Sequence, residues 1–386
     1  MIQAINQLVW RHEPLKTIYL IFALASALVR VPFWFTFALV PPFRPRASWT
    51  IGRTVVVKLA RAYFTAIFNT GSFQWGRVDP QRFAKNEEGV GLVWIDVAPD
   101  LIQGDIKKYA RTNKVSSVHV PAYWYGDRDT HSKAGGWVLG DASPVGMSAP
   151  MVNDMLSHYH QFSRLLNVEY RLASSAPWRT ENPFPAALID AITAYNYLIN
   201  ELHFRPQNVM VVGESAGGTL GVQLVRYIVE SKLPNLPPPG GMLLLSPSMD
   251  WGKTFAFGPG SSYYRNEVSD WVQPFSAGYS GRALLGYLPP SEAQLNAWIS
   301  PASTKLGSAE GLFKGFPPTL IFAGGAEMTY DAMRLAYERI KADTGEEMTV
   351  FVELPDATHI TLSLPWHDRE KEAAYQAMAP WVNAHF

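Results

Sequence analysis

The pentapeptide GESAG at residues 213–217 decides the fold. It matches G-x-S-x-G, the sharp turn that joins a strand to a helix and lifts a serine clear of a sheet. The apolar run NVMVV at 208–212 precedes it and predicts a buried strand, and apolar residues at helical spacing predict a helix over 215–231. The glycines permit a tight turn and the close approach of neighbouring chains. Ser215 is therefore a candidate nucleophile, and a purely structural turn is the alternative.

The chain from residue 89 onward alternates short apolar runs with longer helical patterns. This alternation predicts an α/β fold with a mostly parallel sheet and helices on both faces. The predicted strands cover 91–97, 115–123, 165–170, 208–212, 241–245, 319–323 and 349–354. The predicted helices cover 153–163, 186–202, 215–231, 329–344 and 369–385.

The composition of the 386 residues excludes several classes of protein. Lysine plus arginine and aspartate plus glutamate number 33 each, and this zero net charge argues against a nucleic-acid binder held by positive charge. With 47% hydrophobic and 17% charged residues the chain is not intrinsically disordered. Because there is no cysteine, disulfide scaffolds, thiolate nucleophiles and thiolate metal sites are excluded.

An apolar stretch at 17–40 is long enough to cross a membrane. It contains one charge, Arg30, and one helix breaker, Pro32. Three interpretations remain: a kinked membrane anchor, a re-entrant or interfacial segment, and a signal peptide cleaved after the A-x-A pattern at 25–27. A buried core helix is disfavoured, because the stretch is N-terminal and a proline-rich segment follows it.

A second segment, 54–68, shows helical spacing of apolar residues, with basic residues largely elsewhere on the wheel. It is interpreted either as an amphipathic helix in a lipid interface or as a cap helix on the rest of the protein. We therefore predict two regions, an anchor and cap at residues 1–70 and a main domain at 71–386. Membrane lipid is the expected partner of the first region. An excess of basic residues after the apolar stretch favours a cytosolic main domain.

A serine nucleophile needs a base, and the base needs an orienting carboxylate. With this turn the chain order is serine, acid, histidine. His359 is favoured as the base because its loop directly follows the apolar strand at 349–354, at the edge of the sheet where such sites form. His367 resembles a helix-entry residue, and His385 lies at the extreme terminus.

The acid is expected after the preceding strand. Glu327 is favoured because it comes just after the run PPTLIFAGG at 317–325. Asp331 fits the first turn of a helix better, and Asp356 fits a loop-shaping role. The N–H of Ala216, the residue after the nucleophile, is the expected oxyanion donor.

From about residue 132 the chain resembles the hormone-sensitive-lipase group of α/β-hydrolases, which contains arylacetamide and steryl-acetate deacetylases. The matching sequence motifs are GGWVLG (135–140), EYRLA (169–173), NPFPAALID (182–190), GESAGG (213–218), LLLSPSMDW (243–251) and DATH (356–359). The resemblance implies an α/β-hydrolase fold with a helical cap and hydrolysis of a small lipophilic ester through an acyl-enzyme, without metal or cofactor. It also implies a single N-terminal anchor in the endoplasmic reticulum or another intracellular membrane.

One motif differs from that of the family. The family carries H-G-G-G at the end of an inner strand, where this chain has Lys133, Ala134, Gly135 and Gly136. The N–H groups of Gly135 and Gly136 are expected to complete the oxyanion hole. The polar run at 126–133 predicts no strand, so either 115–123 takes that place or the sheet lacks an inner strand through a missing segment.

Two other functions therefore stay open. With a displaced oxyanion loop the chain would be a catalytically impaired protein that binds a lipophilic ligand. With the same triad it would be an acyltransferase or a peptidase.

Overall fold

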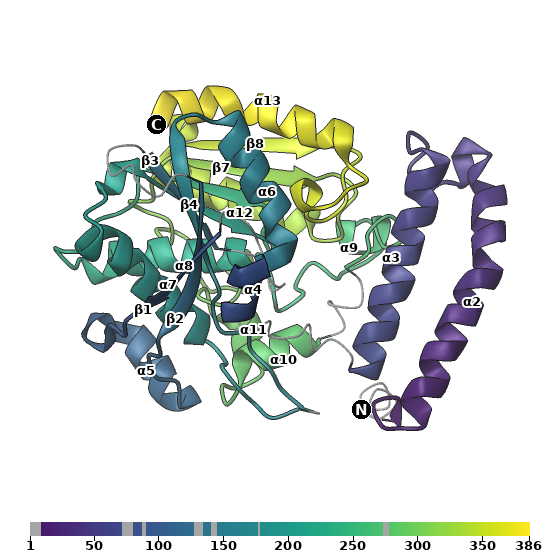
Figure 1. The fold of residues 1–386 in the computed structure, drawn as a ribbon, viewed down its shortest axis with the longest axis horizontal. Coiled ribbons are helices and arrows are strands. Elements are labelled where there is room, and N and C mark those ends of the chain that lie inside the picture. Colours follow the sequence, from purple (N-terminus) through teal and green to yellow (C-terminus); the bar gives the residue numbers. More distant parts are fainter. Residues whose placement is uncertain are drawn as a thin grey trace.

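One eight-stranded sheet forms the centre of the molecule (Figure 1). The computed structural model describes residues 9–71, 80–86, 90–126, 134–139, 145–176, 178–272 and 278–386. The strand order is β1-β2-β4-β3-β5-β6-β7-β8; β2 is antiparallel to β1 and β4, and the pairs from β4 to β8 are parallel. The strands are β1 (Gly91–Ile95), β2 (Val120–Gly126), β3 (Ala134–Leu139), β4 (Phe162–Val168), β5 (Val209–Glu214), β6 (Gly241–Leu245), β7 (Thr319–Gly324) and β8 (Thr349–Leu354).

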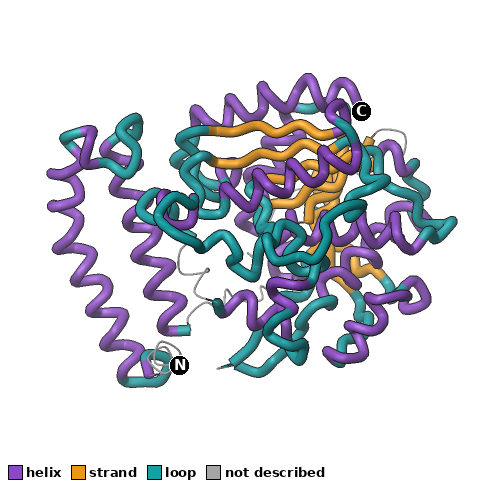
Figure 2. Tube along the Cα trace, turned by 180° about the vertical axis from the view of Figure 1, so that it is seen from behind, coloured by secondary structure: helices purple, strands orange, loops and turns teal. Residues whose placement is uncertain are grey.

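Helices cover both faces of the sheet, as the alternating pattern predicts (Figures 1 and 2). Val209 and Val211 of β5 belong to one buried cluster, with α7, α8 and α12, while Met210 and Val212 belong to the other, with α6 and α13. This alternation explains the continuous apolar strands, because both faces are buried. The helices are α2 (Leu15–Ala38), α3 (Ile51–Thr70), α4 (Pro80–Asn86), α5 (Gly104–Asn113), α6 (Val145–His158), α7 (Ala186–Asn196), α8 (Ala216–Ser231), α9 (Ser262–Arg265), α10 (Tyr279–Leu285), α11 (Glu292–Leu295), α12 (Tyr330–Thr344) and α13 (Asp368–His385).

The inner strand beside β5 is present, and it is β3. Gly135 pairs with Val209, and Leu139 pairs with Gly213, in parallel. The expectation that residues 115–123 fill this place, or that the place is empty, is therefore wrong. A buried gap would leave the backbone groups of β4 and β5 without partners, and the glycine-rich segment itself supplies them.

The first two long helices form an antiparallel hairpin beside the sheet. The Asn69 side chain, near the end of α3, donates to the Tyr19 hydroxyl near the start of α2, at 2.8 Å. Figure 1 shows α3 lying between α2 and the rest of the molecule. Pro32 lies inside α2, which continues through it, and α2 is long and apolar enough to cross a membrane by length and composition.

The α3 helix is tied to the segments that follow β6 and β8. Arg53 forms a two-pronged ion pair with Glu370, at 2.5 and 2.6 Å, and donates to the Trp366 carbonyl at 3.1 Å. Phe64 packs into a buried cluster with Trp271 and Ile360. The predicted segment 54–68 thus packs on the main domain.

The turn between β5 and α8 depends on close packing of glycines. A methyl group on Gly213 would collide with the backbone of Gly217, and one on Gly218 would lie 2.5 Å from the Pro247 side chain. We therefore expect Gly213→Ala to destabilise the protein by about 3 kcal/mol or more, because the backbone cannot move away from the methyl group. Unfolding in urea measures this loss.

Gly307→Ala is the matched control, because nothing lies within 4 Å of a methyl group at this position. Its unfolding midpoint should stay within the ordinary scatter of surface substitutions. An equal loss in both variants would show that the turn is not specially crowded.

Candidate active site

Three polar residues meet where parallel strands end. Ser215 follows β5, Glu327 follows β7, and His359 lies in the loop after β8. Sites in α/β sheets form at this carboxyl edge. The structure therefore brings together the serine, acid and histidine that the sequence predicts.

The three side chains form one hydrogen-bonded chain. Ser215 Oγ lies 2.6 Å from His359 Nε2, and His359 Nδ1 lies 2.7 Å from Glu327 Oε2. The exposed fractions are 8% for Ser215, 4% for His359 and 0% for Glu327. Ser215 has φ +54° and ψ −116°, a strained conformation that aims its side chain out of the turn. This is the arrangement of a nucleophile, a base and an orienting acid.

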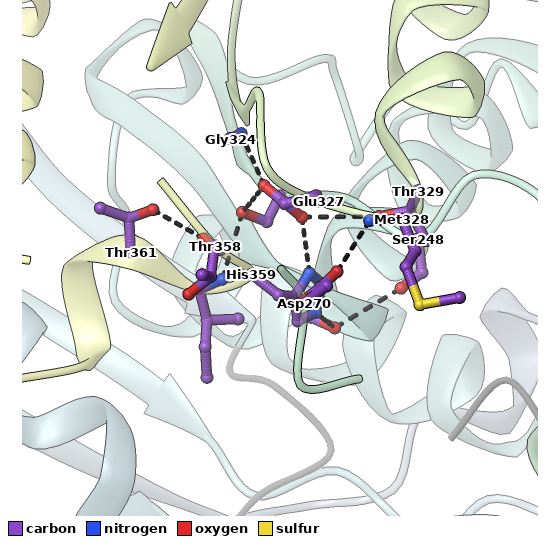
Figure 3. Close-up of polar contacts among 12 residues, drawn as sticks. Ser248, Asp270, Gly324, Glu327, Met328, Thr329, Thr358, His359 and Thr361 are labelled. Atoms are coloured by element: carbon purple, nitrogen blue, oxygen red, sulfur yellow. Dashed lines mark hydrogen bonds and ion pairs between the residues drawn. The ribbon is translucent and has the colours of Figure 1, made fainter. Parts of the chain in front are cut away.

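The Glu327 carboxylate is held by donors on both oxygens. Oε1 accepts the Ser246 hydroxyl at 2.7 Å and the Gly324 N–H at 2.6 Å. Oε2 accepts the Thr329 hydroxyl at 3.4 Å in addition to the histidine (Figure 3). With its position set in this way, Glu327 fixes the orientation of His359.

The rejected candidates have other partners. Asp331 accepts the Ser262 N–H at 2.7 Å, and Asp356 accepts the Ser48 hydroxyl at 2.7 Å. His367 is buried beside Thr358, with Nε2 2.7 Å from that hydroxyl. His385 is the last residue of α13. None of the four hydrogen bonds to the Ser215 or His359 side chain within the described residues.

Gly135 and Gly136 do not lie beside Ser215, and this corrects their assignment as oxyanion donors. Both sit in the first half of β3, where Gly136 pairs with Met210. Met210 is five residues before Ser215 along a strand, which corresponds to about 16 Å. The cause is that this segment forms the inner strand instead of a loop after it. Ala216 is placed as expected, at the first position of α8, where a backbone N–H has no partner inside the helix.

Asp270 is a buried residue of the site region that the sequence does not single out. Its carboxylate accepts the N–H groups of Trp271 and Met328, each at 2.8 Å. Figure 3 shows the bond to Met328. The Met328 bond holds the chain directly after Glu327. Burial raises the pKa of Asp270 to about 6, and the neighbouring Glu327 carboxylate adds to this effect. The motif around it, SDW at 269–271, carries no periodic or turn signal that would have revealed it.

Asp270 makes the stability of the protein depend on pH. Its folded pKa of about 6 lies above the value of 3.8 of an aspartate exposed to water, so between these values the folded state binds more protons than the unfolded state. Stability then falls as pH rises through this window. We expect the free energy of unfolding of the wild type, relative to Asp270→Asn, to fall by roughly 2 kcal/mol between about pH 4 and pH 6. Urea unfolding at several pH values measures it.

Asp343→Asn is the matched control. The Asp343 carboxylate also accepts two backbone N–H groups at 2.8 Å, those of Gly311 and Phe313, but it lies near the far end of α12. If both variants change the pH dependence of unfolding equally, the effect is not specific to Asp270.

Comparisons with known proteins agree with this geometry. A family profile described as "alpha/beta hydrolase fold" matches residues 131–363. An acetyl-hydrolase of Streptomyces hygroscopicus is 28% identical over 213 residues, which is 55% of this chain and 62% of that protein. The matched stretch thus spans less than two thirds of that relative.

Solved structures show the same fold. An esterase from the bacterial hormone-sensitive lipase family has a TM-score of 0.56 at 19% identity, covering 85% of this chain and 98% of that one. A hyperthermophilic esterase from the archaeon Pyrobaculum calidifontis has a TM-score of 0.57 at 16% identity, covering 86% and 93%. The solved structures share the fold, and the profile match over more than half of the residues shows that the chain belongs to the α/β-hydrolase family.

Proposed function

We propose that the protein is a serine carboxylic-ester hydrolase that cleaves a lipophilic ester through an acyl-enzyme. The observation that carries the proposal is the chain of contacts from Ser215 Oγ to His359 Nε2 and from His359 Nδ1 to Glu327. When the Nδ1–H group donates a hydrogen bond to the carboxylate, Nε2 carries no proton and is free to accept the serine proton.

In the first half of the reaction, Ser215 Oγ attacks the acyl carbon while its proton passes to His359 Nε2. The negative charge that develops on the acyl oxygen is stabilised by the Ala216 N–H at the start of α8. His359 then gives the proton to the leaving alcohol, and the acyl group remains on Ser215. In the second half, water attacks this ester with His359 as the base, which releases the carboxylic acid and restores the serine.

Glu327 acts on the histidine. Its negative charge favours the protonated imidazole that exists between the two proton transfers. The donors from Ser246 and Gly324 keep the carboxylate in place, so the imidazole does not need to reorient during the reaction.

The substrate class follows from two supporting observations. The relative from Streptomyces hygroscopicus is an acetyl-hydrolase, which makes esters of short acyl groups the first to test. The apolar helix α2 supports association with a membrane, where a lipophilic ester would be dissolved. An intracellular membrane, such as the endoplasmic reticulum, is part of the proposal.

We expect Ser215→Ala to lower the turnover of p-nitrophenyl acetate and butyrate by about 10⁴-fold or more, because no other group replaces the nucleophile. The same variant should no longer be labelled by a fluorophosphonate probe, while its circular dichroism spectrum stays that of the wild type. Retained turnover with this folded variant would refute the assignment.

Ser248→Ala is the matched control. Ser248 Oγ lies 3.5 Å from Ser215 Oγ, on the loop after β6. Because its described contacts include no histidine, the variant should keep the fluorophosphonate label. If Ser248→Ala abolishes labelling and Ser215→Ala does not, the nucleophile is Ser248 and not Ser215. Adding alcohol acceptors to the assay separates hydrolysis from acyl transfer.

A further inference from the structure

A groove of about 420 Å³ lies between α2 and α3, away from the triad. Both helices contribute to its walls, and Val268 lies at one side. Trp34 of α2 lies at one end of the groove, where the Arg30 guanidinium is 5.1 Å and Lys58 Nζ is 6.0 Å from its ring. The ring thus collects two cations from different helices at one place.

Positive charge predominates in this groove. The lining includes three cations, Arg30, Lys58 and Arg61, and no carboxylate among the described residues. Arg61 is paired with Glu267, at 3.2 Å. Arg30 donates to the Ser26 carbonyl of its own helix at 3.1 Å, and neither Arg30 nor Lys58 has a carboxylate partner within the part of the chain that the structure describes. Partial burial lowers the pKa of Lys58, so a bound anion would stabilise its charged form.

The surface of α2 is mostly apolar and exposed, and it reaches the edge of this groove. Six of its large apolar side chains have 60% or more of their surface exposed, and one of them, Phe22, also lines the groove; the others are Ile21, Leu24, Leu28, Val29 and Phe33. A continuous exposed surface of this kind marks a contact with a protein or a membrane. Cations directly beside it match the charge of anionic lipid headgroups, because the apolar side chains reach the acyl region while the charges stay at the surface.

The position of α3 decides how α2 meets the membrane. Because α3 lies between α2 and the domain, and Arg53 of α3 is paired with Glu370 of the domain, the hairpin is fixed to the domain's flank (Figure 1). An α2 that crossed the bilayer would carry Arg53, Lys58 and this flank into the hydrocarbon, at a cost of several kcal/mol for each charge. The described geometry therefore favours α2 lying in the plane of the membrane surface.

We propose that the groove between α2 and α3 binds the anionic headgroup of a membrane phospholipid, with α2 lying flat in the interface. Arg30 and Lys58 contact the phosphate, and the acyl chains lie against the exposed apolar side chains of α2 that border the groove. The proposal rests on the proposed membrane association and is independent of the proposed ester hydrolysis.

The test compares the full-length wild type with the double variant Arg30→Gln/Lys58→Gln. Co-sedimentation is measured with vesicles of phosphatidylcholine alone and of phosphatidylcholine mixed with phosphatidylserine. We expect the variant to bind the mixed vesicles about 10- to 30-fold more weakly and the neutral vesicles equally well. Hydrolysis of p-nitrophenyl acetate without vesicles should be unchanged, so loss of binding is distinguished from loss of the enzyme.

Lys107→Gln/Arg205→Gln is the matched control, with one exposed lysine and one exposed arginine of the main domain. It should bind mixed vesicles as the wild type does. Three results would overturn the proposal. The groove variant binds mixed vesicles as tightly as the wild type, its binding to neutral vesicles falls as much as its binding to mixed vesicles, or the wild type binds neither kind of vesicle. In a further measurement, inorganic phosphate is added to the protein bound to mixed vesicles, with chloride at the same ionic strength as the control. If phosphate releases the protein and chloride does not, the groove binds a free anion and not a lipid headgroup.

Orientation is tested separately by a tag placed before α2 in proteoliposomes. A protease added outside should remove the tag from molecules whose main domain is outside, because α2 does not cross the bilayer. Protection of the tag in such molecules would show a spanning helix and contradict the flat orientation.

Discussion

A carboxylate with no exposed surface, that of Glu327, constrains the rest of the site. Such a group is tolerated away from water only when hydrogen-bond donors surround it. The donors come from three neighbouring strands: Gly324 ends β7, Ser246 follows β6, and His359 follows β8. These donors converge only if the three strands lie side by side, parallel and in register. The arrangement of the sheet is therefore a precondition of the chemistry.

The sequence predicts the residues whose signals are local. Ser215 stands in a five-residue motif between a strand and a helix, and Glu327 and His359 each follow an apolar strand that the structure confirms. The sequence does not predict the strand Ala134–Leu139, because glycines are poor strand formers and no apolar run precedes them. Without this strand, the backbone groups of β4 and β5 would lack hydrogen-bond partners, and that cost exceeds the low strand propensity of glycine. The cost is evident only in the assembled sheet.

Contacts between distant parts of the chain are the second class that the sequence does not reveal. Asp270 binds the N–H of Met328, 58 residues away, and Arg53 binds Glu370, 317 residues away. Each is an ordinary polar residue in its own segment. Their roles depend on which loops the fold brings together, so composition, periodicity and motif spacing carry no trace of them.

The docking of α3 has a practical consequence for anyone who shortens the chain. Phe64 stacks on Trp271 with ring centres 4.6 Å apart, and Trp271 in turn donates to the His359 carbonyl at 3.3 Å. A protein trimmed to the hydrolase domain for easier purification would expose this tryptophan and loosen the loop that carries the histidine. Any kinetics measured on it would then describe a damaged histidine loop and not the properties of the intact protein.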